Sequence, residues 1–123
     1  MNAVTLRRLL RMVWEWFRDA GPARAPERRS LLLMRRWLSA HQREQFDARG
    51  YFDVVGSHTN RRYRIRFGTS TNIYELDSFE QPIGGWCFVP TECVPPGDVM
   101  LAQKIALEND ELSALAVARP FHL

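Results

Sequence analysis

The sequence is poor in cysteine and contains no long apolar run. Its two cysteines, Cys87 and Cys93, are too few to cross-link a domain of 123 residues, and they fall short of the roughly four ligands of a structural zinc site. No run of about 18 apolar residues occurs, so we expect no transmembrane segment. Arg7, Arg8 and Arg11 interrupt the apolar core that a secretory signal needs. We therefore expect a cytoplasmic protein with reduced thiols.

Lysine is also scarce, since Lys104 is the one lysine among 17 basic residues. Residues 1–66 hold 15 arginines against six acidic residues, a balance of +9. Residues 67–123 hold Lys104 and Arg119 against eight acidic residues, a balance of −6. Such an asymmetry can steer an anionic partner to one side of the molecule. Alternatively, the two halves neutralise each other in the fold, and the arginine bias reflects codon usage.

Signals of catalysis and of cofactor binding are weak. The glycine pair at 84 and 85 lacks the spacing of a phosphate-binding loop. A nucleophilic pair of Cys93 and His58 would have no oxyanion loop and no orienting acid beside it. Cys87 alternates with Trp86 and Phe88, which is typical of an inert, buried thiol on a strand. We expect a protein that is not an enzyme and that carries neither metal nor cofactor.

The N-terminal part of the chain has the periodicity of an amphipathic helix. Apolar residues recur at three- and four-residue spacing over residues 2–19, and a segment rich in glycine and proline follows. We predict an N-terminal amphipathic helix at 1–20, a linker at 21–26 and a single α+β domain at 27–123. The leading helix can dock on the body, dimerise, lie on a membrane surface or bind a protein partner. Its candidate partner-binding residues are Arg7, Arg8, Arg11, Trp14 and Trp16.

Two further helices are expected before the first strand. One begins near Pro26 or Glu27 and continues towards Trp37. Ser39 and Gln42 have the spacing of a capping box, which predicts a new helix after Ser39. Gly50 is well placed to end that helix in the left-handed conformation.

The second half of the domain predicts strands and a final helix. Short segments rich in β-branched and aromatic residues at 51–55, 61–67, 72–77 and 86–89 are separated by turn-forming residues. Such short connections favour an antiparallel meander. A last helix should begin with Asp98 as its cap and end at Pro120. We predict an α+β fold in which a four-stranded antiparallel meander packs on one face against the helices. The expected core comprises Leu31, Trp37, Phe46, Phe52, Val54, Tyr63, Ile65, Tyr74, Leu76, Phe88, Leu101, Ile105 and Leu112.

The segment RRYRIRFGTSTNIYELD at residues 61–77 raises two alternatives. Alternation along a strand places Arg62, Arg64 and Arg66 on one face. A four-residue loop would set Phe67 opposite Asn72, and the resulting register pairs Arg64 with Glu75 and Arg62 with Asp77. In that case the hairpin neutralises itself, with Arg61 and Arg66 left over. The alternative is a nucleic-acid-binding face. Its candidate residues are Arg61, Arg62, Arg64, Arg66, His58 and Asn60.

The chain from Leu38 to Ala118 resembles an uncharacterised family of small bacterial and phage-borne proteins. The resemblance is carried by the "YFDVVG" and "RRYRIR-G" strands, the "CF-P" strand and the "GDVMLAQKIALE" helix. It implies a compact module that travels on mobile elements, and it implies no activity.

Composition and pattern together favour a small basic binding module. We expect it to recognise nucleic acid or a nucleoprotein complex through its arginine-rich half. The alternative is a protein–protein adaptor or inhibitor, related to phage or mobile elements, that acts through the N-terminal helix. Salt dependence separates the two, because phosphate contacts weaken steeply with salt.

Overall fold

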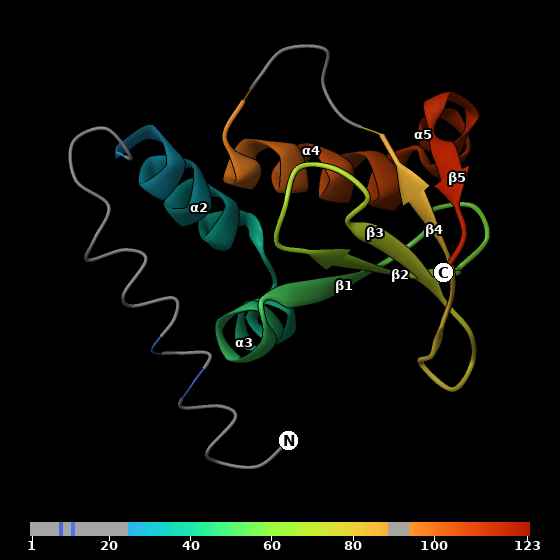
Figure 1. The fold of residues 1–123 in the computed structure, drawn as a ribbon, viewed down its shortest axis with the longest axis horizontal. Helices are drawn as coiled ribbons and strands as arrows, with labels where there is room; N and C mark the ends of the chain where they lie inside the picture. The colour runs from blue at the N-terminus through green and yellow to red at the C-terminus, as the bar shows by residue number, and fades with distance from the viewer. Residues whose placement is uncertain (1–7, 9–10, 12–24, 89–93) are drawn as a thin grey trace.

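The computed structural model describes residues 8, 11, 25–88 and 94–123 of the chain (Figure 1). The N-terminal helix that we predict therefore lies outside the described residues, except for Arg8 and Arg11, which are exposed. Trp14, Trp16 and Cys93 also lie outside them. Among the described residues, no helix has the length and apolar character needed to cross a bilayer.

Two helices open the described body, and local sequence signals set the limits of the second. α2 (Ala25–Trp37) is followed by α3 (Ala40–Arg49). The predicted capping box is confirmed: the Gln42 N–H donates to Ser39 Oγ at 3.1 Å, and the Ser39 N–H donates to Gln42 Oε1 at 3.0 Å. Gly50 ends α3 with φ of 75°, a left-handed conformation that glycine adopts without strain, as predicted.

Within residues 25–88 and 94–123 the sheet has five antiparallel strands, one more than predicted. Their spatial order is their order in the chain. The prediction lacks β5 because it treats Pro120 only as the end of a helix. Proline is tolerated in β5 because an edge strand needs hydrogen bonds on one side only. The fourth strand begins at 82 rather than at 86. The strands are β1 (Tyr51–Val55), β2 (Arg62–Arg66), β3 (Ile73–Leu76), β4 (Pro82–Cys87) and β5 (Arg119–Phe121).

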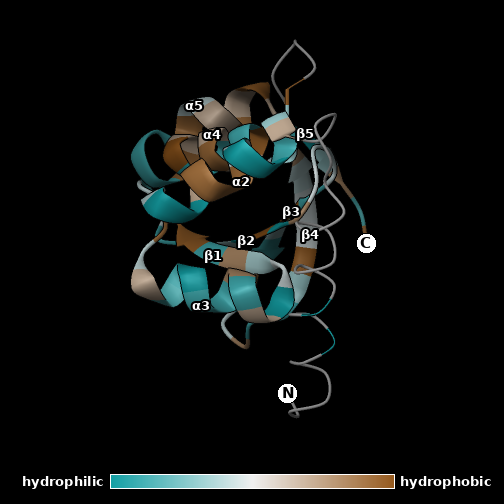
Figure 2. Ribbon diagram, turned by 90° about the vertical axis from the view of Figure 1, so that its left-hand side faces the viewer, coloured by the Kyte–Doolittle hydropathy of each residue, from teal (hydrophilic) through white to brown (hydrophobic). Residues whose placement is uncertain are grey.

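The helices lie on both sides of the sheet, whereas we expected them on one face. Figure 2 shows α2 and α4 (Pro96–Asn109) on one side of β1 and β2, and α3 on the other. The position of α3 follows from the free edge of β1. The Asp53 N–H donates to Gln45 Oε1 and Gln42 Nε2 donates to the Asp53 carbonyl, each at 2.9 Å. α3 thus satisfies polar groups that an open edge would expose to other chains.

The core lies between the sheet and the α2–α4 pair. Trp37, Ile105 and Leu112, which we expected in it, are exposed, and Tyr74 is only half-buried. α2 instead buries Leu31 and Met34, and Trp37 is the last residue of the helix. Phe88 and Leu101 pack against the core and are partly buried. The buried apolar cluster comprises Leu31, Met34, Leu38, Phe46, Phe52, Val54, Tyr63, Ile65, Ile73, Met100, Leu107 and Ala114.

The last predicted helix is in fact two helices. α4 ends at Asn109 and α5 (Glu111–Val117) follows, with Asp110 between them at φ of −151°. The break turns Glu111 into the interior, where its side chain is fully buried. Asp98 is not the cap of α4. Pro95 takes that position and makes no side-chain cap, and Asp98 lies in the first turn.

The β2–β3 register differs by one residue from the one that we predicted. Arg64 lies opposite Tyr74, and Tyr63 lies opposite Glu75. The cause is the connecting loop, which has five residues rather than four. The Arg66 N–H donates to the Asn72 carbonyl at 2.8 Å, and the buried Asn72 side chain exchanges hydrogen bonds with Gln103 of α4. The shift moves Ile73 into the core and Tyr74 to the opposite face.

Candidate nucleic-acid interface

The candidate site lies on the face of the sheet that points away from α4, which we call the outer face. Residues opposite each other in an antiparallel pair point to the same side. One row therefore crosses all five strands on this face. The members of that row, in strand order, are Asp53, Arg64, Tyr74, Gly85 and Phe121. The predicted placement of Arg62, Arg64 and Arg66 on one face is confirmed by the same pairing.

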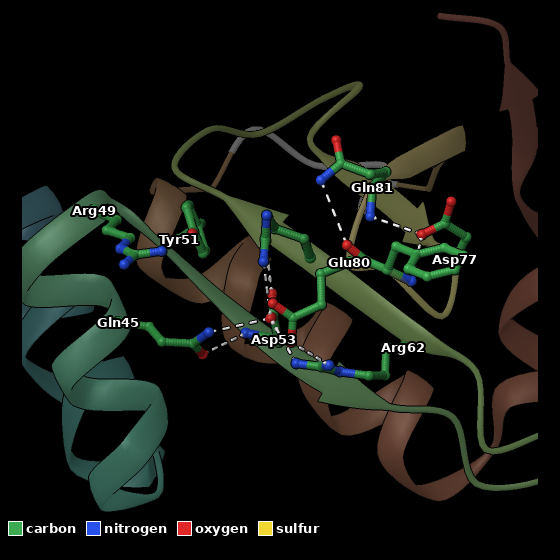
Figure 3. Close-up of polar contacts among 10 residues, drawn as sticks. Gln45, Arg49, Tyr51, Asp53, Arg62, Asp77, Glu80 and Gln81 are labelled. Atoms are coloured by element: carbon green, nitrogen blue, oxygen red, sulfur yellow. Dashed lines mark hydrogen bonds and ion pairs between the residues drawn. The ribbon is translucent and has the colours of Figure 1, made fainter. Parts of the chain in front are cut away.

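Asp53 gathers two of the three β2 arginines around one buried carboxylate (Figure 3). Arg64 Nε donates to its Oδ1 at 2.8 Å, and Arg62 Nη2 donates to its Oδ2 at 3.2 Å. Gln45 from α3 donates to Oδ2 at 3.1 Å, and Arg62 also donates to Glu80 at 2.6 Å. The predicted pairs of Arg64 with Glu75 and of Arg62 with Asp77 are therefore wrong, because the shifted register leaves Asp53 as the acid beside both arginines.

The surroundings of this cluster stabilise the ionised form of Asp53. Burial on its own raises the pKa of the Asp53 carboxyl. Hydrogen bonds from Arg64 and Gln45 and the charges of Arg64 and Arg62 outweigh burial, so the pKa lies below its ordinary value. The hydrogen bond to Asp53 in turn raises the pKa of Arg64. Asp53 and Glu80 thus neutralise Arg62 and Arg64.

Arginine and aromatic rings alternate beyond this cluster. The Arg64 guanidinium carbon lies 4.0 Å from the centroid of the Tyr51 ring, and Arg66 lies 4.7 Å from that of Tyr74. Arg49 Nη1 donates to the Tyr51 hydroxyl at 2.9 Å. Arg66 is exposed, and no carboxylate of the residues that the structure describes pairs with it. We call Arg49, Tyr51, Arg64, Arg66, Tyr74 and Phe121 the arginine–tyrosine surface.

Phe121 completes this surface from the C-terminal strand. Its ring lies over Gly85, where an added Cβ would overlap the ring atoms. The ring also meets Tyr74 edge-on, with centroids 5.6 Å apart. Glycine at position 85 therefore allows an aromatic pair to form across β3, β4 and β5.

The loop between β1 and β2 is held by a second buried carboxylate, that of Glu111. Its Oε1 accepts the N–H groups of His58 and Thr59 at 2.9 and 2.8 Å. Its Oε2 accepts the hydroxyls of Thr59 and Tyr63. Burial on its own raises the pKa of Glu111, but these donors lower it to about 2. Burial and the adjacent carboxylate raise the pKa of Tyr63.

The structure separates the residues that we predicted as one nucleic-acid site. His58 and Asn60 lie in the Glu111-bound loop, at the other end of β2 from Arg66. The His58 ring contacts Ser57 Oγ at 3.0 Å and is exposed. Arg61, which we expected without a partner, pairs with Glu75 at 3.1 Å. Of the six predicted residues, Arg64 and Arg66 belong to the arginine–tyrosine surface.

Sequence reasoning missed Tyr51, Tyr74 and Phe121. Tyr51 and Asp53 are two residues apart in β1, as are the arginines in β2. This shared spacing could have predicted that Tyr51 and Asp53 lie on the same face as the arginines. The predicted register places Tyr74 in the core, whereas the observed register turns it to the outer face. No local signal identifies Phe121, since its position depends on a strand that pairs with a glycine 36 residues earlier in the chain.

Other chemistry has little support within the described part of the chain. No group of three or more histidine, cysteine or acidic residues there is arranged to hold a metal ion. Cys87 lies on β4, as predicted, but it is partly exposed rather than buried. Its sulfur accepts the Thr71 N–H at 3.4 Å.

Comparison with known proteins adds no family to these observations. No family model matches the chain, and neither a curated protein nor a solved structure is significantly similar to it.

Proposed function

We propose that this protein is a non-enzymatic binding module that holds nucleic acid on its arginine–tyrosine surface. The observation that carries the proposal is the placement of Arg66 over Tyr74. The guanidinium is exposed, and no described carboxylate neutralises it. Arginines interleaved with aromatic rings on an open sheet suit single strands, because bases stack on rings and guanidinium planes while cations contact phosphates.

The distribution of ion pairs favours the arginine–tyrosine surface, rather than the β1–β2 loop, as the place where phosphate binds. Asp53, Glu75 and Glu80 each pair with arginines of the 61–64 segment, so little of that segment's charge remains for phosphate. Arg49 and Arg66 have no such acid among the described residues, and both flank Tyr51. Phosphate contact is therefore centred on the end of the sheet where Arg49, Tyr51 and Arg66 meet.

The test is binding of a fluorescent single-stranded oligonucleotide, measured by anisotropy between 50 and 200 mM salt, for the wild type and three variants. We expect Tyr74→Ala to weaken binding about tenfold, since base stacking contributes about 1–3 kcal/mol. Arg66→Ala should weaken it and reduce the salt slope by about one. Arg61→Ala is the matched control, because it removes the same charge from a residue already paired with Glu75.

Two results would contradict the proposal. One is an absence of binding by the wild type at 50 mM salt. The other is an equal loss in Arg61→Ala and Arg66→Ala, which would show that net charge alone governs binding. Circular dichroism melts of all variants separate lost binding from lost folding.

A further inference from the structure

The turn between β3 and β4 presents apolar side chains to solvent. The Phe79 side chain is 82% exposed and that of Ile83 is 60% exposed. Asp77 and Glu80 flank them, and residues 77–83 contain no cationic side chain. We call Asp77, Phe79, Glu80 and Ile83 the hairpin tip. Together, Phe79 and Ile83 offer apolar surface that a partner could bury.

The hairpin tip is well ordered by its own hydrogen bonds (Figure 3). Asp77 Oδ1 accepts the N–H groups of Phe79 and Gln81 at 2.8 and 2.9 Å, and the Asp77 N–H donates to the Gln81 carbonyl at 2.9 Å. Glu80 is held by Arg62 at 2.6 Å. Phe79 is therefore presented on a preorganised backbone, which reduces the conformational entropy lost when the tip binds.

A second surface, which combines apolar side chains with positive rather than negative charge, lies on α2. Leu32, Leu33 and Trp37 are exposed, and Trp37 is 64% exposed. Leu33 and Trp37 are four residues apart and share one side of the helix, and Leu32 lies beside Leu33 in the sequence. Arg28, Arg29 and Arg36 are exposed beside them, and none of the three pairs with a described carboxylate. We call these six residues the α2 outer surface.

The two surfaces complement each other in charge, and each offers apolar groups for burial. One combines Asp77 and the Arg62-paired Glu80 with Phe79 and Ile83, and the other combines three arginines with Leu32, Leu33 and Trp37. Figure 1 shows α2 and the β3–β4 turn at opposite ends of the long axis, so they do not meet within one molecule. We propose that the hairpin tip of one copy of this chain docks on the α2 outer surface of a second copy.

Such a contact joins two different surfaces, so it is heterologous. In a pair joined by one such contact, one copy keeps a free tip and the other keeps a free α2 surface, so the assembly grows into a ring or an open chain rather than stopping at a symmetric dimer. Arg66 and Tyr74 take no part in this contact. Self-association is therefore independent of nucleic-acid binding.

Sedimentation velocity of the full chain over a range of concentrations at 50 mM salt tests the proposal. We expect species larger than a dimer at high concentration, and weaker association at 500 mM salt. Phe79→Ala should weaken association tenfold or more, as should the double variant Arg36→Glu with Trp37→Ala. Val117→Ala is the matched control for loss of an exposed apolar group, since Val117 is 75% exposed on α5. Arg66→Glu is the matched control for charge reversal.

Mixing the two defective variants gives the sharpest result. The Phe79→Ala copy keeps an intact α2 outer surface, and the double variant keeps an intact tip. An equimolar mixture should therefore form dimers and nothing larger, although each variant alone is monomeric. A wild type that stays monomeric throughout would overturn the proposal. So would variants that associate as the wild type does, or a mixture that forms no dimer.

Discussion

Glu111 and Asp53 are both buried carboxylates that anchor the β1–β2 hairpin, yet their partners differ in kind. Glu111 accepts hydrogen bonds from neutral donors: two backbone N–H groups, a threonine hydroxyl and a tyrosine hydroxyl. Asp53 accepts from two arginines and a glutamine. Both pKa values are lowered, because donors outweigh burial in each case. Neutral donors fix a loop without changing the surface charge, whereas arginine donors use up cations that could otherwise bind phosphate.

Glu111 holds the fold together, whereas Asp53 sets the charge of the outer face. Glu111 closes the β1–β2 loop onto the start of α5, and the space around it is tight. An added Cβ at Gly56 would overlap the Glu111 carboxylate. Asp53 lies at the centre of the outer face and decides how many strand arginines remain available.

The largest effect should come from removing the Glu111 carboxylate. Glu111→Ala leaves the N–H groups of His58 and Thr59 and the Tyr63 hydroxyl without their acceptor. Each unsatisfied buried group costs about 1–3 kcal/mol, so we expect a loss of about 3 kcal/mol or more in the free energy of unfolding. Urea denaturation measures it. Asp110→Ala, the exposed neighbour, should change stability by less than about 0.5 kcal/mol. A loss in Glu111→Ala as small as in that control would mean that the loop is held by other contacts.

Acid should weaken the same interaction in a defined range of pH. The pKa of Glu111 is about 2 in the folded state and 4.5 ordinarily, so its ionised form contributes fully to stability above pH 4.5. That contribution falls as the pH falls from 4.5 towards 2. Glu111→Gln lacks it at every pH. The difference in unfolding free energy between the wild type and Glu111→Gln should therefore shrink over this range in urea titrations. A difference that stays constant would contradict the assignment.

A smaller effect is expected at Asp53, where a substitution should lower stability but raise the affinity for nucleic acid. Asp53→Asn weakens the hydrogen bonds from Arg62 and Arg64 and should cost about 1–2 kcal/mol of unfolding free energy. The same change releases the charge of both arginines, so affinity for single-stranded oligonucleotide should rise and the salt slope should steepen.

Glu75→Gln is the matched control for this variant. It changes the net charge equally but releases Arg61, which lies outside the arginine–tyrosine surface. Equal gains in affinity in Asp53→Asn and Glu75→Gln would show that net charge, and not the position of the released arginine, determines affinity.

Much of the local structure followed from the sequence. The capping box of Ser39 and Gln42, the left-handed Gly50 and the limits of β1 were predicted correctly. The common face of Arg62, Arg64 and Arg66 was also predicted correctly. Each depends on residues within a few positions of one another, so a short window of sequence contains the necessary information.

The tertiary structure decided which groups meet. Asn72 is held by Gln103 from α4, and this contact accompanies the five-residue loop and the β2–β3 register. That register, with the pairing of β1, selects Asp53 rather than Glu75 or Asp77 as the acid for Arg64, and it turns Tyr74 outward. These outcomes depend on contacts between residues far apart in the chain, whose relative positions are set only when the helices pack on the sheet. The sequence by itself thus determined where the arginines lie along β2, and only the folded chain determined which of them keep their charge unpaired.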